Sequence, residues 1–354
     1  MKTAVIALTK IGSELAVKVA AKLDADIYLK QEFLKNDAEC LQSIYPIQGS
    51  IATLVSKLFN AYDAWVFVMA CGIVVRTIAP YIHSKTSDPA ILVVDEKGQH
   101  VISLLSGHIG GANKLASKVA EITGGTPVIT TSTDVNEVVS FDVFAIENDC
   151  AIENIENLKF ISSEMVNGGM VGFYTDCTLK GNSPKNIVFI PLQNSNEPDP
   201  SECKVILTNR LDIKPTGLKT LYLRPRNLVL GIGCKKGTSM EQIQLAVEDF
   251  MKKNNRSALS IRCLATIDLK KDEEGLLKFC KQSALKLNII SRTEIEKIEE
   301  NFTCSEFVKQ QVGVASVAEP CAVLSSTNGR LICKKTVYKG ITLALTEEER
   351  EYSL

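Results

Sequence analysis

Short apolar segments alternate with helix-forming segments at both ends of the chain, and this alternation limits the fold more than any other feature. Near the N-terminus the apolar runs Thr3–Leu8 and Ala64–Ala70 are separated by stretches with helical periodicity, such as 12–23. The pattern starts again at Leu228–Gly233. Strands that alternate with helices are typical of βαβ units and mostly parallel sheets. The sequence therefore predicts an α/β fold at each end.

The segment between these two regions is less periodic and contains the polar stretch 194–200. We therefore predict three parts: an N-terminal α/β domain (1–140), a smaller α+β middle segment (141–224) and a C-terminal α/β domain (225–354). The acidic end of the chain, Glu347–Glu351, is expected to be solvated.

The composition is that of an ordinary globular protein. Of 354 residues, 45% are hydrophobic and 23% charged, and the net charge of -1 argues against a general nucleic-acid binder. No apolar run is long enough to span a bilayer, and the N-terminus lacks a secretory signal, so we expect a cytoplasmic protein without membrane contact. Eleven cysteines without a C-x-x-C pair argue against a disulfide framework and a structural zinc site.

The most informative motif runs from Ser106 to Asn113 (SGHIGGAN), between a predicted strand and a helix. Glycines let the backbone approach a ligand closely, and a helix N-terminus offers free N–H groups. Gly110 and Gly111 could therefore hold a carboxylate or an oxyanion, and His108 could act as a general base. The alternative is that Ser106 and Asn113 only cap the turn and the helix, with His108 on the surface. The motif is not the G-x-S-x-G of α/β-hydrolases.

Two further segments carry candidate binding residues. In 71–80 a glycine again follows a strand, and Arg76 lies one turn into the predicted helix, where it could pair with a carboxylate. Lys85 and Asp88 follow on a loop. The stretch Thr130–Asp134, which includes Thr131, supplies hydroxyls and one carboxylate at the end of a strand. An exposed helix charge, a turn and a capping loop are the alternatives.

The C-terminal part contains a glycine-rich turn beside a cationic stretch. Between Asp212 and Glu241 there are six basic residues and no acidic one, which favours an anion-facing role for Gly231, Gly233, Lys235 and Lys236. The turn departs from both the P-loop and the dinucleotide fingerprint.

Two pairs of residues have the spacing of a capping box, Thr238 with Glu241 and Ser316 with Glu319. For the second pair, a ligand contact is the alternative.

Together these segments resemble the cobalt-precorrin-5A hydrolase family of anaerobic cobalamin biosynthesis, known as CbiG. The resemblance rests on the GIVVR-x-IAP segment from Gly72, on SGH-x-GGAN, on TTSTD from Thr130, and on GIGC from Gly231 with SV-x-EP from Ser316. Ser132 stands where the family more often has alanine.

The resemblance implies a hydrolase that opens the lactone of cobalt-precorrin-5A and releases the meso carbon as acetaldehyde, giving cobalt-precorrin-5B. It implies a corrinoid as the small-molecule partner and a cobalt ion that arrives with the substrate, so that no cofactor or protein metal site is needed. Neighbouring pathway enzymes are further candidate partners. His108 is then the first choice of base, with Asp134 or Glu319 assisting carbon–carbon cleavage. A substrate-binding role is expected for Arg76, Lys85, Asp88, Ser106, Gly110, Gly111, Asn113, Thr131, Gly231, Gly233, Lys235, Lys236 and Ser316.

The alternatives are a non-catalytic corrinoid-binding or transfer protein and, with less support, a nucleotide-dependent enzyme or a corrin-ring methyltransferase. The sequence leaves open which residue is the base, whether both domains contact one substrate, the order of the two chemical steps and the oligomeric state.

Overall fold

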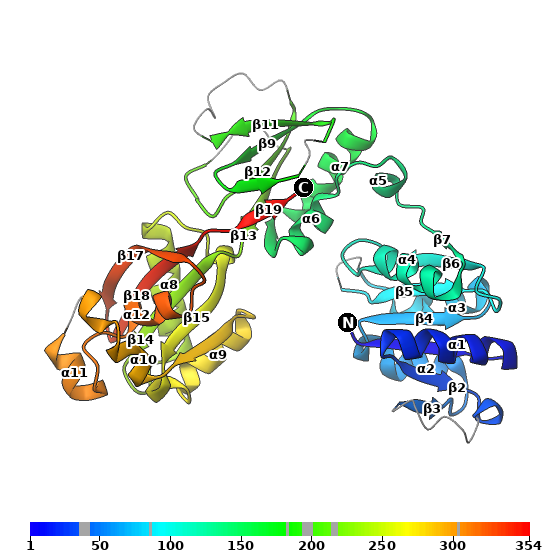
Figure 1. The fold of residues 1–354 in the computed structure, drawn as a ribbon, viewed down its shortest axis with the longest axis horizontal. Helices are drawn as coiled ribbons and strands as arrows, with labels where there is room; N and C mark the ends of the chain where they lie inside the picture. The colour runs from blue at the N-terminus through cyan, green and yellow to red at the C-terminus, as the bar shows by residue number, and fades with distance from the viewer. Residues whose placement is uncertain (35–42, 85–86, 182–183, 193–200, 214–218, 303–304) are drawn as a thin grey trace. The chain divides into compact units, whose positions relative to one another are not determined.

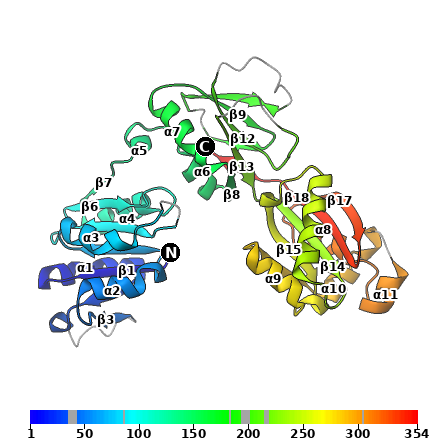
Figure 2. The same ribbon diagram turned by 180° about the vertical axis from the view of Figure 1, so that it is seen from behind.

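The computed structural model describes residues 1–34, 43–84, 87–181, 184–192, 201–213, 219–302 and 305–354. The chain divides into two units, residues 1–143 and 144–354 (Figures 1 and 2). The structure confirms the predicted fold class, because the sheets are mostly parallel and are combined with helices.

The first unit contains a seven-stranded sheet in the order β3-β2-β1-β4-β5-β6-β7. Strands β1 to β5 are parallel to one another. The strands are β1 Thr3–Ala7, β2 Asp26–Leu29, β3 Ile44–Pro46, β4 Ala64–Val68, β5 Ala90–Val94, β6 His100–Leu105 and β7 Thr126–Val128, and the helices are α1 Lys10–Leu23, α2 Ile51–Leu58, α3 Cys71–Ile78, α4 Ala112–Thr123 and α5 Ser132–Val135.

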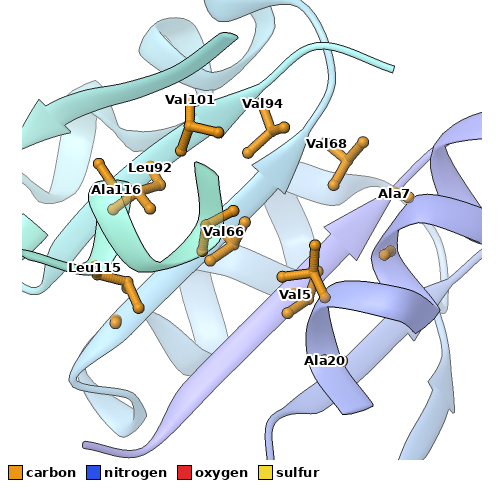
Figure 3. Close-up of a cluster of buried hydrophobic side chains, with 14 of the residues drawn as sticks. Val5, Ala7, Ala20, Val66, Val68, Leu92, Val94, Val101, Leu115 and Ala116 are labelled. Atoms are coloured by element: carbon orange, nitrogen blue, oxygen red, sulfur yellow. The ribbon is translucent and has the colours of Figure 1, made fainter. Parts of the chain in front are cut away.

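Helices cover both faces of this sheet, which explains why its central strands are apolar on both sides. Figure 3 shows one face, where Val5, Val66 and Leu92 pack with Ala20 of α1 and Ala116 of α4. The alternate residues of the same strands, among them Trp65, pack with α2 and α3 on the other face. The central strands β1, β4 and β5 are therefore buried on both faces.

Strand β6 runs antiparallel to β5, which the alternation of strands and helices did not predict. Leu92 pairs with Ser103 and Val94 with Val101. Only residues 95–99 separate the two strands, and a parallel crossover needs a dozen residues or more. The reversal brings the carboxyl end of β6 to the amino ends of β4 and β5. The turn that carries His108 and the turn at Gly72 therefore lie at opposite edges of the sheet.

Helix α6 (Phe141–Glu147) contains the boundary between the units, and the second unit continues with a five-stranded sheet in the order β11-β9-β12-β13-β8. Only β8 is antiparallel to its neighbour. The elements are β8 Cys150–Glu153, α7 Leu158–Val166, β9 Val171–Thr175, β10 Thr178–Lys180, β11 Ile187–Pro191, β12 Cys203–Leu207 and β13 Lys219–Pro225.

The third sheet has the order β16-β15-β14-β18-β17, in which β14, β15 and β16 are parallel. Helices α8 and α9 pack on one face and α12 on the other. The elements are β14 Leu228–Cys234, α8 Met240–Lys253, β15 Ile261–Ile267, α9 Glu274–Gln282, β16 Lys286–Ile290, α10 Arg292–Glu296, α11 Glu306–Val312, α12 Ala318–Leu324, β17 Gly329–Tyr338, β18 Ile341–Glu348 and β19 Glu351–Ser353.

Local predictions in this region are corrected by the structure. The capping box of α8 is formed by Ser239 and Gln242, one residue later than predicted, because the Thr238 hydroxyl donates to the carbonyl of Lys235. The acidic end is not a solvated tail, since β18 extends through the buried Glu348 and β19 pairs with β10. None of the helices in the described residues is long and apolar enough to cross a membrane.

Candidate active site

The turn between β6 and α4 has a tight backbone that depends on its glycines. Ser106 and Gly111 both have positive φ, 58° and 82°, and Gly111 is the N-cap of α4. A Cβ on Gly110 would lie 2.4 Å from the Cβ of Ser106, and one on Gly107 would lie 2.7 Å from Oδ1 of Asn113. The glycines therefore allow a tight turn that fixes the position of His108.

His108 lies between two carboxylates. Its Nε2 is 2.7 Å from Oδ2 of Asp134, and its Nδ1 is 3.3 Å from Oδ2 of Asp142. The hydroxyls of Thr133 and Ser140 lie 3.2 Å from Nε2 and 3.1 Å from Nδ1. The Ser140 hydroxyl also donates to Asp142. Both ring nitrogens thus have acceptors, which is the arrangement that stabilises an imidazolium.

This environment changes the ionisation of the histidine. The hydrogen bond to Asp142 is the largest cause that raises the pKa of His108 to about 9; burial opposes it, and the bond to Asp134 adds to the rise. The pKa of Asp142 is lowered, because its hydrogen bonds to His108 and Ser140 outweigh the effect of burial, the largest single cause. At neutral pH His108 is therefore a cation and Asp142 an anion.

A second set of hydrogen bonds holds Asp134. The Asn113 amide donates to Oδ2 of Asp134 and to Oγ1 of Thr131, both at 3.1 Å, and its own Oδ1 accepts from Ser103 at 2.7 Å. Asn113 is buried, whereas 38% of the Asp134 side chain is exposed. The site thus presents one accessible carboxylate next to an imidazolium.

Ser106 and Asp88 support the turn. The Ser106 hydroxyl donates to the Asp88 carbonyl at 2.9 Å, and the Asp88 carboxylate accepts from the backbone N–H groups of His83 and Ser84. Both side chains are buried. The Gly111 N–H donates to the His108 carbonyl at 2.9 Å, so in this conformation it is not available to a ligand.

Arg76 and Lys85 are the two cations of this unit that the sequence predicts to bind the substrate. Arg76 is exposed near the end of α3, with its guanidinium beside Gly72. Lys85 lies outside the described residues.

The glycines of the C-terminal turn pack against protein. A Cβ on Gly231 would lie 1.8 Å from the carbonyl oxygen of Ala318, and one on Gly233 would lie 2.7 Å from Oγ1 of Thr342. Gly231 therefore lets α12 contact the backbone of β14. Lys235 and Lys236 are exposed at the end of this strand.

Ser316 and Glu319 do not form a capping box, because α12 begins at Ala318 with Val317 as N-cap. Both are buried, with exposed fractions of 1%. Glu319 accepts the backbone N–H of Lys335 at 2.9 Å. Among the described residues, the Ser316 hydroxyl has no hydrogen-bond partner. A catalytic role for Glu319 would need a route from solvent to its carboxylate.

Sequence reasoning missed Asp142 and Ser140. They follow α5 in the stretch Val139-Ser140-Phe141-Asp142, where the segment of weak periodicity starts. In the sequence this stretch looks like the start of a helix, and α6 does begin at Phe141. A serine two residues before an aspartate is too common a pattern to indicate a histidine partner. Only the fold brings them to His108.

Within the part of the chain that the structure describes, no group of three or more His, Cys, Asp or Glu side chains could hold a metal ion. All nine described cysteines are free thiols. That the substrate supplies the only metal stays a prediction.

The chain is thus an α/β protein whose first unit holds His108 between the carboxylates of Asp134 and Asp142. Such a set of side chains can take part in acid–base catalysis. Three family models match in sequence order: cobalamin synthesis G N-terminal (residues 53–134), cobalamin biosynthesis central region (139–225) and cobalamin synthesis G C-terminus (228–346). His108 and Asp134 fall in the first match, and Asp142 in the second.

Relatives match over nearly the whole chain. A cobalt-precorrin-5A hydrolase of Priestia megaterium is 33% identical over 97% of this chain and 94% of its own. One of Salmonella typhimurium is 31% identical over 97% and 96%. A solved structure of a putative cobalamin biosynthesis protein G homolog from Sulfolobus solfataricus is 23% identical, covers 98% of this chain and 97% of its own, and has a TM-score of 0.40. The chain belongs to the CbiG family.

Proposed function

We propose that this chain is a cobalt-precorrin-5A hydrolase that acts in cobalamin biosynthesis. The observation that carries the proposal is the identity of 33% and 31%, each over 97% of the chain, with two relatives of that name. The acid–base group around His108 supports it, because hydrolysis of a lactone needs a group that takes a proton from water and one that stabilises negative charge.

The reaction has two chemical steps. Water adds to the lactone carbonyl and the ring C–O bond breaks, which leaves a carboxylate and a free hydroxyl. Loss of the hydroxyl proton then allows the carbon–carbon bond to the macrocycle to break. Its electron pair passes into the macrocycle, which takes up a proton, and the two-carbon fragment leaves as acetaldehyde.

We assign the general base to Asp134. A histidine with a pKa of about 9 is protonated at neutral pH and cannot take a proton from water. Asp134 is partly exposed, and among the described residues only its Oδ2 has hydrogen-bond donors. Its Oδ1 is free to accept a proton from water or from the released hydroxyl. Of the two carboxylates considered from the sequence, Asp134 is accessible and Glu319 is buried.

His108 then acts as a cation instead of a base. An imidazolium beside the reacting carbonyl stabilises negative charge on its oxygen through its positive charge, since both of its ring nitrogens already bond to carboxylates. Of the two predicted oxyanion donors, Gly110 keeps the role, since the Gly111 N–H already donates to the His108 carbonyl.

Peripheral carboxylates of the substrate need cations. Lys235 and Lys236 in the second unit are exposed and suited to this task. Arg76 is exposed too, but its guanidinium lies beside Gly72, at the edge of the first sheet opposite to His108. Ser106, Asp88 and Asn113, which the sequence suggests as direct ligands, act on the substrate through the turn and through Asp134.

The test is acetaldehyde release from purified cobalt-precorrin-5A. With Asp134→Asn we expect kcat to fall by roughly 10²–10⁴-fold, the usual contribution of a general base, while the shape of the site is kept. The matched control is Asp95→Asn, which alters a carboxylate that holds the β5–β6 loop of the same unit.

Each outcome separates the alternatives. Near-normal release by Asp134→Asn would remove Asp134 as the base, and near-normal release by His108→Ala would remove His108 from the mechanism. A wild-type protein that binds the substrate and releases no acetaldehyde would be a corrinoid-binding or transfer protein. We expect the reaction to take place in the cytoplasm, because the described cysteines are free thiols.

A further inference from the structure

Strand β6 contains a bulge that places a serine on the face of the sheet that α4 covers. Ile91 of β5 pairs with Leu105, but the next residue, Leu92, pairs with Ser103, so that Leu104 is an extra residue in β6. Residues that lie opposite each other on paired strands share a face of the sheet, and Leu92 packs in the core beneath α4. Ser103 is therefore a polar residue on an apolar face. Bulges beside active sites redirect side chains in this way.

The Ser103 hydroxyl bonds to the side-chain amide of Asn113. It donates to Oδ1 of Asn113 at 2.7 Å. The amide nitrogen Nδ2 donates to Oγ1 of Thr131 and to Oδ2 of Asp134, both at 3.1 Å. Because a carboxylate accepts hydrogen bonds and an amide oxygen cannot donate one, the nitrogen must face Asp134 and the oxygen must face Ser103. These three bonds are formed in one orientation of the amide only.

Gly107 provides the space that this amide occupies. A Cβ at position 107 would lie 2.7 Å from Oδ1 of Asn113, and its next two neighbours, at 3.1 Å, belong to the same amide. Gly107 is not among the residues with positive φ, so its backbone would accept alanine. What excludes a side chain at this position is therefore the Asn113 amide.

The amide in turn holds the carboxylate that we assign as the base. Among the described residues, hydrogen bonds reach only Oδ2 of Asp134, from Asn113 at 3.1 Å and from Nε2 of His108 at 2.7 Å. Two donors on one oxygen fix the rotation of the carboxylate and leave Oδ1 for the reacting proton. Asn113 is buried, so its own position is well defined. A catalytic group that is displaced by about 1 Å can cost about 100-fold in rate.

We propose that Ser103 and Gly107 are positioning residues for the base, which act through the Asn113 amide and hold Asp134 in the rotation that presents Oδ1 to the substrate. The inference rests on the proposed function for the role of Asp134. Neither residue contacts the substrate, so their replacement should change the chemical step and leave substrate binding intact.

The first test is acetaldehyde release from purified cobalt-precorrin-5A. We expect Ser103→Ala and Gly107→Ala to lower kcat by about 10–100-fold, as a misplaced catalytic group does, and to keep KM within about twofold of the wild-type value. Ser103→Thr keeps the hydroxyl and should keep kcat within about threefold.

The matched control is Ser117→Ala on the same helix. Its hydroxyl donates to the backbone carbonyl of Asn113 at 3.3 Å and does not contact the amide, so kcat should stay at the wild-type value. A kcat of Ser103→Ala and Gly107→Ala equal to that of the control would overturn the proposal, and so would an equal loss in Ser103→Ala and Ser103→Thr.

The second test needs no substrate and follows His108 by NMR titration. Asp142 is the largest cause of the raised pKa of His108, and the hydrogen bond to Asp134 adds to it. A displaced Asp134 should therefore lower the pKa of His108 in Gly107→Ala, by less than the loss of Asp142 does. The Ser117→Ala control should titrate like the wild type. A His108 pKa in Gly107→Ala equal to that of the wild type would contradict a displaced carboxylate.

The positioning role and the proposed function fail in different ways. A wild-type protein that releases no acetaldehyde would overturn the hydrolase, and the titration of His108 would still decide whether Gly107 holds Asp134 in place. An active wild type whose His108 titration and kcat are both unchanged in Gly107→Ala would keep the hydrolase and overturn the positioning role.

Discussion

Replacing Asp142 by asparagine tests whether a buried carboxylate keeps His108 charged. The rise of the His108 pKa from 6.5 to about 9 corresponds to roughly 3 kcal/mol in favour of the imidazolium. The hydrogen bond to Asp142 is its largest cause. Asparagine keeps the shape of the side chain and removes its charge. We therefore expect the pKa of His108 to fall in Asp142→Asn, and the folded state to lose about 1–2 kcal/mol at pH 6, which corresponds to roughly one pKa unit.

The pH dependence has a defined sign. The raised pKa of His108 stabilises the folded state fully below pH 6.5, and this contribution is lost as the pH rises through about 9. The lowered pKa of Asp142 stabilises it above the ordinary value of 3.8, and that contribution is lost as the pH falls further. The difference in Tm between wild type and Asp142→Asn should thus be largest between pH 3.8 and pH 6.5, at about 3–6 °C. The difference should shrink as the pH rises through about 9.

The assay is an NMR titration of the histidine ring protons. The chain has three histidines, so few signals overlap, and His108→Gln identifies the signal of His108. Asp95→Asn, which alters the carboxylate beside His100, is the control and should leave the His108 titration unchanged. A His108 signal that titrates below pH 7 in the wild type, or one that does not move in Asp142→Asn, would refute the reasoning.

The remaining predictions concern the second unit. Gly231→Ala would place a Cβ 1.8 Å from the Ala318 carbonyl oxygen and separate α12 from β14. We therefore expect the free energy of unfolding to fall by about 1–3 kcal/mol or more, as measured by urea denaturation. A variant as stable as the wild type would contradict the close packing of α12 on β14. Glu348→Gln removes the charge of a buried carboxylate that binds Arg262 at 2.6 and 3.0 Å. We expect the free energy of unfolding to fall by about 3–5 kcal/mol. A change under about 1 kcal/mol in urea denaturation would show that the ion pair is dispensable for stability.

Several features of the fold could be predicted from local pattern alone. Apolar runs such as Ala64–Val68 are buried strands because they are apolar on both faces, and helices follow them in the expected order. The direction of β6 was missed although the sequence contains a signal. The segment Asp95–Gln99 is too short for a crossover between parallel strands and contains a turn glycine, Gly98.

The candidate site could be predicted only in part. The glycines around His108 indicate a turn that holds a side chain in place, and Asp134 has a carboxylate in a plausible position. The burial of Ser316 and Glu319 could not be read from capping-box spacing, because the same spacing occurs in a helix start that is exposed and in one that is packed against a strand.

The sequence by itself determined the alternation of strands and helices and the glycine turn, since backbone preferences and apolar periodicity act over a few residues. The class of chemistry came from the resemblance of its motifs to the CbiG family. The tertiary structure decided the protonation of His108, because its partners Asp134 and Asp142 lie 26 and 34 positions further along the chain. The imidazolium is stable at neutral pH because opposite charges are fixed around the ring in three dimensions and outweigh the opposing effect of burial. For that physical reason, a residue that reads as a base in the sequence is a cation in the fold.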